Sequence, residues 1–111
     1  MRLNEKARAA IEIMSGYGPG ILTRESLAPL VAPEVLAYLE ERLIVETVRG
    51  TERRGKRAKL RLASWVRREL DRRGVSVVLR AGEQLSPPPS VAERLKSREA
   101  RRQSVREQGE E

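Results

Sequence analysis

The chain contains no cysteine, no histidine and no phenylalanine, and its aromatic residues are one tryptophan and two tyrosines. The lack of cysteine and histidine excludes disulfides, thiol nucleophiles, imidazole acid–base catalysts and most zinc sites. The core must therefore be aliphatic, built from leucine, valine, isoleucine and alanine. A cysteine-free chain is compatible with a reducing interior, and we expect a cytoplasmic protein.

Residues for catalysis and for membrane insertion are also scarce. Asp71 is the only aspartate and lies among arginines, and no second carboxylate is placed to make an acid–base pair with any glutamate. We therefore predict that the protein is not an enzyme and uses no cofactor or metal. Charged residues between Arg2 and Glu12 argue against a signal peptide, and no run approaches the roughly 20 apolar residues of a spanning helix.

What the sequence does have is positive charge, concentrated in one place. The 111 residues carry 23 lysines and arginines against 16 aspartates and glutamates, a net charge of +7. Residues 49–61 hold seven of the basic residues and one acidic residue, Glu52, so this stretch alone carries a net +6. Gly50 and Gly55 punctuate the stretch and apolar runs flank it, which predicts a β-hairpin with a cationic tip.

The residues before this stretch predict three helices. Asn4 is a suitable cap for the first helix. The apolar residues that follow recur at helical spacing and predict one buried face, formed by Leu3, Ala7, Ala10, Ile11 and Met14. Residues 16–20, rich in glycine and proline, are predicted to end this helix in a turn, after which Ile21 and Leu22 make a short extended step.

Thr23 is a suitable cap for a second helix over residues 24–31, although Pro29 lies inside that span and would bend it. Pro33 suits the first position of a third helix. The two helices together are predicted to bury Leu27, Leu30, Val31, Val35, Leu36, Leu39 and Leu43.

From residue 44 the apolar pattern changes to period two and β-branched residues concentrate, which indicates a strand. On the return strand Leu60 and Leu62 alternate with Lys59 and Arg61, so one face should pack and the other should be cationic.

Ser64 is predicted to cap a fourth helix that ends at Gly74, with Trp65 as an anchor in the core rather than a stacking platform. Arginines on this helix alternate with Glu69 and Asp71, so intrahelical ion pairs explain them as well as an extension of the basic surface does. Residues 75–79 are apolar and rich in valine, and they predict a further strand that could join the sheet or pair across a two-fold axis.

These boundaries divide the chain into a domain over residues 1–80, a proline-rich linker over 81–89 and a charged tail over 90–111. Successive prolines at the end of the linker favour an extended spacer. Near-balanced charge and few apolar residues predict a tail that is partly helical or disordered, and that could serve as a weakly basic arm or a partner-binding helix.

The order of a helix, a short extended step, two helices and a basic hairpin resembles the winged helix–turn–helix of prokaryotic regulators of the MarR and PadR kind. The resemblance covers about residues 4–73. It rests on the local sequence of residues 39–46 (LEERLIVE), on the basic loop that follows, and on residues 59–62 (KLRL). It implies a small α+β winged-helix domain that binds DNA and commonly forms a homodimer.

One departure from the family concerns the helix that precedes the hairpin, which in these regulators enters the major groove. In this chain that helix offers Glu34, Glu40 and Glu41 against a single Arg42, a balance that phosphate would repel. The hairpin is therefore the better candidate for contact.

Nucleic acid is the predicted partner, and double-stranded DNA is the favoured form, bound by a transcriptional regulator or an architectural protein. The predicted contact residues are Arg49, Arg53, Arg54, Lys56, Arg57, Lys59 and Arg61. Two alternatives stay open: an RNA- or ribosome-associated protein that uses the same surface, and a winged-helix module that docks a protein on its acidic third helix. The basic stretch could also be a solvated loop without a ligand, paired with the acidic first half of this protein or of a neighbouring one.

Overall fold

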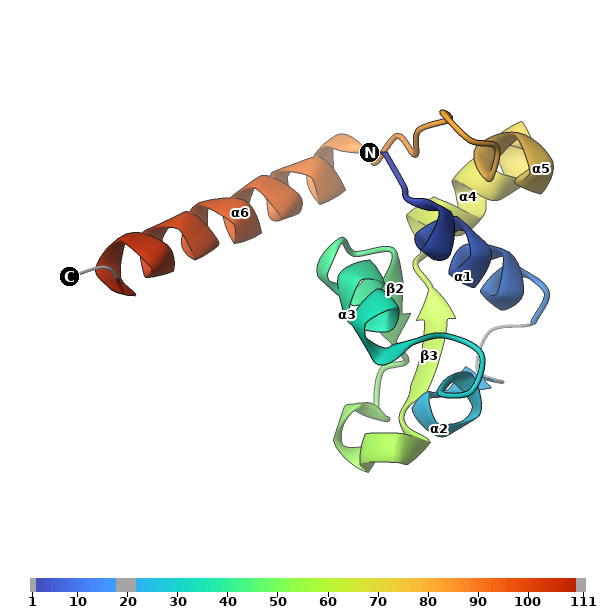
Figure 1. Ribbon diagram of the computed structural model, residues 1–111, viewed down its shortest axis with the longest axis horizontal. Coiled ribbons are helices and arrows are strands. Elements are labelled where there is room, and N and C mark those ends of the chain that lie inside the picture. The colour runs from blue at the N-terminus through green and yellow to red at the C-terminus, as the bar shows by residue number, and fades with distance from the viewer. Residues whose placement is uncertain (1, 18–21, 110–111) are drawn as a thin grey trace.

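Three helices precede the basic stretch and three follow it within residues 2–17 and 22–109, the part of the chain that the computed structural model describes (Figure 1). The helices are α1 (Glu5–Ser15), α2 (Arg24–Leu27), α3 (Pro33–Glu41), α4 (Ser64–Arg73), α5 (Val75–Val78) and α6 (Pro89–Gly109). The strands are β1 (Leu22–Thr23), β2 (Val45–Thr47) and β3 (Lys59–Leu62), and a 3-10 helix, η1 (Glu52–Arg57), connects the last two. The protein is a small, mostly helical α+β globule with a three-stranded antiparallel sheet.

The predicted start and buried face of α1 are confirmed. The side-chain oxygen of Asn4 accepts the backbone N–H of Ala7 at 2.8 Å, which satisfies one of the free donors in the first turn. All five residues of the predicted stripe are buried, and they form one wall of the core. The turn predicted after this helix lies largely outside the described residues, as does Ile21.

Helix α2 begins where predicted but ends early. Thr23 and Ser26 form a reciprocal capping box at its start. The helix ends at Leu27, because Pro29 has no N–H to continue the hydrogen-bond ladder, and Leu30 is 49% exposed rather than buried. The prediction of a helix through residue 31 that buries Leu30 was therefore wrong.

Helix α3 begins with Pro33 in its first turn, as predicted, and buries Leu36 and Leu39. It ends at Glu41, and Leu43, two residues beyond, adopts a positive φ of 61°. The N–H of Leu43 bonds the carbonyl of Glu40, and the N–H of Ile44 bonds that of Leu39, the double closure of a Schellman motif. This turn aims the chain directly into β2.

The sheet has the order β1–β3–β2, so β3 is central and β2 is an edge strand. β2 and β3 pair antiparallel, with Val45 opposite Leu62, which confirms the predicted hairpin. The predicted alternation on the return strand is also confirmed, since Leu60 and Leu62 are buried and the alternating basic residues, Lys59 and Arg61, are half-buried. The short extended step supplies the third strand, with Leu22 opposite Leu60.

Two predictions for residues 64–79 were wrong. Ser64 is the first residue of α4 and Ala63 occupies the cap position, with no side-chain hydrogen bond. The strand predicted over residues 75–79 is the short helix α5, because a left-handed Gly74 (φ 89°) turns the chain and one helical turn buries Val78. A short apolar run does not distinguish a buried strand from a helical turn.

Trp65 is a core residue, as predicted. Its side chain is 7% exposed, and its indole Nε1–H donates to the carbonyl of Leu43 at 2.7 Å. This bond ties the first turn of α4 to the end of α3.

The segment after α5 packs against the globule. Leu85 is 1% exposed and belongs to the same core cluster as α1, while Gln84 forms an isolated antiparallel bridge with Arg2. The division of the chain at residues 80 and 89 stays a prediction.

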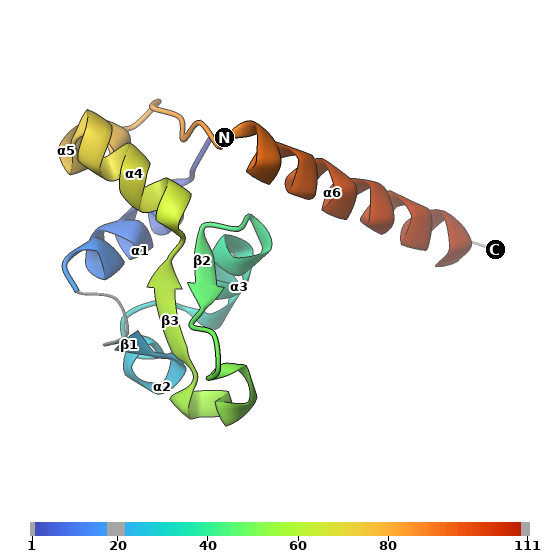
Figure 2. The same ribbon diagram turned by 180° about the vertical axis from the view of Figure 1, so that it is seen from behind.

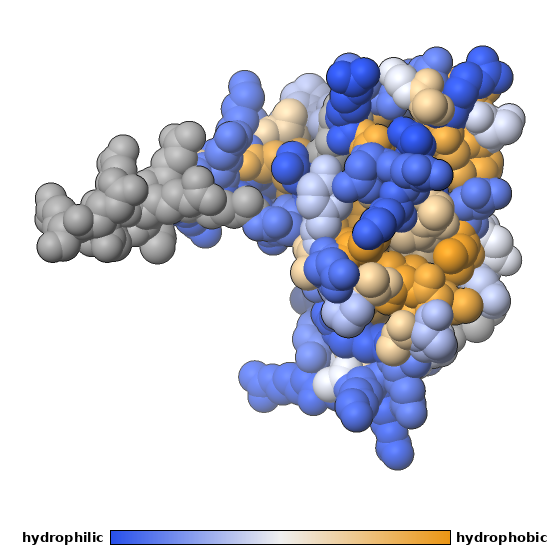
Figure 3. Space-filling view, viewed as in Figure 1, coloured by the Kyte–Doolittle hydropathy of each residue, from blue (hydrophilic) through white to orange (hydrophobic). Residues whose placement is uncertain are grey.

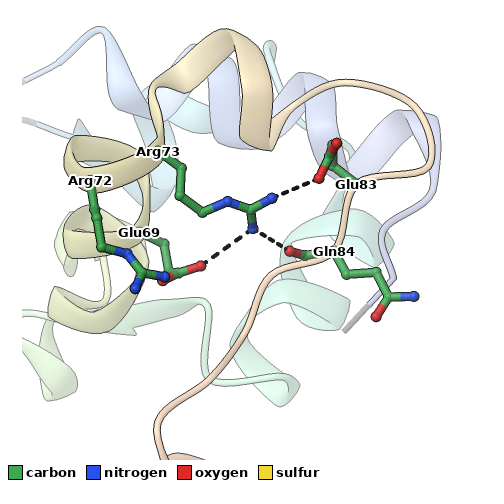
Figure 4. Close-up of polar contacts among 5 residues, drawn as sticks. All are labelled: Glu69, Arg72, Arg73, Glu83 and Gln84. Carbon is green, nitrogen blue, oxygen red and sulfur yellow. Dashed lines mark hydrogen bonds and ion pairs between the residues drawn. The ribbon is translucent and has the colours of Figure 1, made fainter.

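Arg73 joins α4 to this segment (Figure 4). Its guanidinium pairs with Glu83 at 2.6 Å, donates to the carbonyl of Gln84 at 2.7 Å, and lies 3.5 Å from the buried carboxylate of Glu69. Arg72 also pairs with Glu69, although its side chain is 70% exposed. The predicted intrahelical pairs are therefore present in part, since Arg67, Arg68 and Asp71 make no ion pair among the described residues.

We expect Arg73→Ala to lower the free energy of unfolding by about 2 kcal/mol, because charge-assisted bonds are lost and a buried carboxylate keeps fewer partners. The matched control, Arg67→Ala, removes an exposed arginine of the same helix that has no ion-pair partner among the described residues, and should cost about 0.5 kcal/mol or less. Urea denaturation of the two variants measures the difference. Equal losses would contradict the role assigned to Arg73.

Helix α6 projects from the globule on the side of β2 (Figures 1 and 2). Val91 is buried at its base and Leu95 packs against the core. Arg98 donates to the carbonyl of Glu41 at 3.0 Å and makes a longer contact of 3.5 Å with that of Glu40, which fixes the direction of α6 against the C-terminal end of α3. The 21 residues of α6 form an arm about 31 Å long.

Candidate nucleic-acid interface

The basic stretch forms the far end of the β2–β3 hairpin, with η1 at its tip (Figure 1). Figure 3 shows hydrophilic side chains projecting from this end of the molecule. We call the surface formed by residues 49–57 the basic tip.

Hydrogen bonds hold the backbone of the basic tip. The hydroxyl of Thr51, a buried residue, donates to the carbonyl of Val48 at 2.7 Å and accepts the N–H of Lys59 at 3.1 Å. Ala58 is 1% exposed, and its carbonyl accepts the N–H of Arg24 at 3.1 Å, which braces the tip against α2. Gly55 reverses the chain with φ 59° and ψ −118°, a conformation that side chains rarely adopt.

Five basic side chains are exposed on this held backbone: Arg49, Arg53, Arg54, Lys56 and Arg57. Among the described residues none of the five has an ion-pair partner. The one acidic residue, Glu52, accepts the N–H of Gly50 at 2.8 Å and closes the turn. Pairing of these side chains with the acidic first half of the protein is therefore absent among the described residues.

The other two predicted contact residues are placed differently. Lys59 and Arg61 lie on β3 and are half-buried. Arg61 pairs with Glu46 on β2, Nε to Oε1 at 2.8 Å, so its charge is largely satisfied within the sheet. The structure thus gathers five of the seven predicted residues on the tip and separates two from it.

The acidic character of α3 is lower than the sequence indicates. Glu40 pairs with Arg24 on α2 at 2.7 Å. The guanidinium of Arg42 lies over the ring of Tyr38, 4.9 Å from its centroid. Glu34 remains exposed at the start of the helix. Because Arg24 pairs with Glu40, α3 presents less unpaired negative charge, which weakens the alternative in which a protein docks on this helix.

Sequence reasoning missed a second group of basic residues. A groove of about 430 Å³ runs between β2, the start of α4 and the base of α6, and Arg68, Arg94 and Arg98 line it. We call it the arm groove. The spacing of Arg94 and Arg98, one helical turn apart, is the only sequence signal for it, and the contribution of Arg68 required the fold.

No group of three or more acidic, histidine or cysteine side chains that could hold a metal ion occurs within the described ranges. Of the helices described, none is both long and apolar enough to cross a membrane. No family model matches the chain, and neither a curated protein nor a solved structure matches it.

Proposed function

We propose that the protein binds double-stranded DNA through the basic tip, as a small cytoplasmic transcriptional regulator or architectural protein. The observation that carries the proposal is a set of five exposed basic side chains, without ion-pair partners among the described residues, on a hairpin whose backbone is held in place. Such a surface suits the phosphate backbone, since each contact releases condensed counterions.

The proposal includes a winged-helix reading of the fold. Supporting it are the element order α1–β1–α2–α3–β2–β3 and the sheet order β1–β3–β2, with the basic tip in the place of a wing. In this reading α3 would be the groove-facing helix. Its exposed residues offer little to read bases, so the proposed binding rests mainly on backbone contact.

The possible homodimer that the resemblance implies stays a prediction. The strand that suggested pairing across a two-fold axis is the helix α5. The basic tip itself needs no second copy.

The wild-type protein should bind random-sequence duplex DNA with a steep salt dependence. If all five exposed cations of the tip meet phosphates, the tip alone should contribute about −4 to −5 to the slope of the logarithm of the association constant against the logarithm of salt concentration. A fluorescence-anisotropy titration at several salt concentrations measures this slope. No binding at low salt would refute the proposal.

Competition at one salt concentration compares the affinity for duplex DNA with that for duplex RNA and for single strands. Duplex RNA or single strands that compete better than duplex DNA would favour the RNA-associated alternative. A selected-site library alongside tests whether any sequence is preferred over random duplex.

A further inference from the structure

The arm groove lies beside β2, whose outer edge is free of strand pairing among the described residues. Val45, Glu46 and Thr47 of β2 line one side, and Arg94 and Arg98 of α6 line the other. Buried apolar side chains, Trp65 and Val91 among them, contribute to its lining. The groove thus lies between the sheet edge and the arm and has both charged and apolar residues in its lining.

The charges in the arm groove do not cancel. The two acids in its lining are already engaged, Glu40 by Arg24 and Glu46 by Arg61. Arg68 and Arg94 are exposed and have no ion-pair or hydrogen-bond partner in the described part of the chain. Arg98 donates to backbone carbonyls, which leaves its positive charge without a counterion there.

The arm groove and the basic tip are connected by β2. Thr47 lines the groove, and the chain reaches Arg53 on the tip only six positions later. At the reach of an extended chain this separation is at most roughly 20 Å. Both ribbon views show α6 projecting on the β2 side of the sheet (Figures 1 and 2).

We propose that the arm groove is a second phosphate-binding site for the same nucleic-acid backbone that the basic tip contacts. This inference rests on the proposed function and extends it. Phosphodiesters are the occupant that the site favours, because three arginines converge on a groove whose acids are already paired. A polymer, unlike a free phosphate, can span the distance to the tip and engage both cation clusters at once.

The test is a double variant, Arg68→Ala with Arg94→Ala, which leaves Arg98 in place to hold α6 on α3. Since neither arginine has a partner among the described residues, the fold should be unchanged by circular dichroism and thermal unfolding. On duplex DNA the salt slope should become shallower by about 2, and affinity at about 0.1 M salt should fall roughly five- to tenfold.

The matched control is Lys6→Ala with Arg80→Ala, which removes the same charge from two exposed residues that do not line the groove. Its slope and affinity should stay at the wild-type values. If the Arg68/Arg94 variant also keeps wild-type slope and affinity while the wild type binds, the groove proposal is overturned and the proposed function stands. If the wild type itself does not bind duplex DNA, the proposed function and the groove proposal are both refuted.

Discussion

Replacing Arg53, Arg54, Lys56 and Arg57 together with alanine should weaken binding to duplex DNA by at least about 100-fold at 0.1 M salt. These four side chains are exposed on η1 and take part in no ion pair within the described residues, so their loss removes phosphate contacts and no internal pair. The salt slope should become shallower by about 3 to 4, because each lost contact removes about 0.9 from it.

A control variant must distinguish the effect of losing contacts at the basic tip from the effect of lowering the net charge of the protein. Alanine at four exposed basic positions outside the tip and the arm groove lowers the net charge by the same amount; suitable positions are Arg2, Lys6, Arg67 and Arg80. This variant should lose little affinity, since it keeps every tip contact. Equal losses in the two variants would mean that net charge alone, and not the basic tip, governs binding.

Trp65→Ala should lower the free energy of unfolding by about 3 to 5 kcal/mol, the cost of removing a large core side chain. The ring is 7% exposed, and its indole N–H holds the carbonyl of Leu43 at the turn into β2. A domain of this size has little stability to spare, so the variant should be largely unfolded at 37 °C. Urea denaturation followed by circular dichroism measures the loss.

Trp65→Phe separates packing from the hydrogen bond, because phenylalanine keeps an aromatic ring and lacks the N–H. We expect a loss of about 1 to 2 kcal/mol, from one hydrogen bond and some ring volume. Leu30→Ala is the surface control, since Leu30 is 49% exposed, and should change stability by about 0.5 kcal/mol or less. A loss for Trp65→Ala no larger than that of Leu30→Ala would contradict the core role.

Local signals in the sequence predicted much of the fold. Asn4, Thr23 and Pro33 mark helix starts through their own bonding capacity, and each lies at or beside the predicted start. The hairpin was predicted from the change of the apolar pattern to period two. The pattern is present in the structure because only one face of β3, with Leu60 and Leu62, packs in the core.

The errors arose where short segments depend on tertiary contacts. Residues 75–79 are too few for periodicity to separate one helical turn from a strand, and the burial of Val78 decides the outcome. The predicted burial of Leu30 was wrong because Pro29 ends α2 earlier than the apolar pattern indicates.

Most of the candidate site was visible in the sequence, because seven basic residues within thirteen positions need no fold to be noticed. The sequence could not show which charged side chains form ion pairs with one another. Arg61 is paired with Glu46, and Glu40 is paired with Arg24, both across long separations in the chain. The arm groove required three separate elements to converge, and no local pattern encodes that.

The bracing of the basic tip by Thr51 and Ala58 bears on the entropy of binding. Fixing the backbone of one residue costs roughly 1 to 2 kcal/mol at 25 °C. A free peptide with the sequence of residues 49–61 would incur that cost on every phosphate backbone it met, whereas here folding has already ordered the chain around η1. Only side-chain rotamers remain to be fixed on contact, so the intact protein should bind more tightly than a peptide of equal charge.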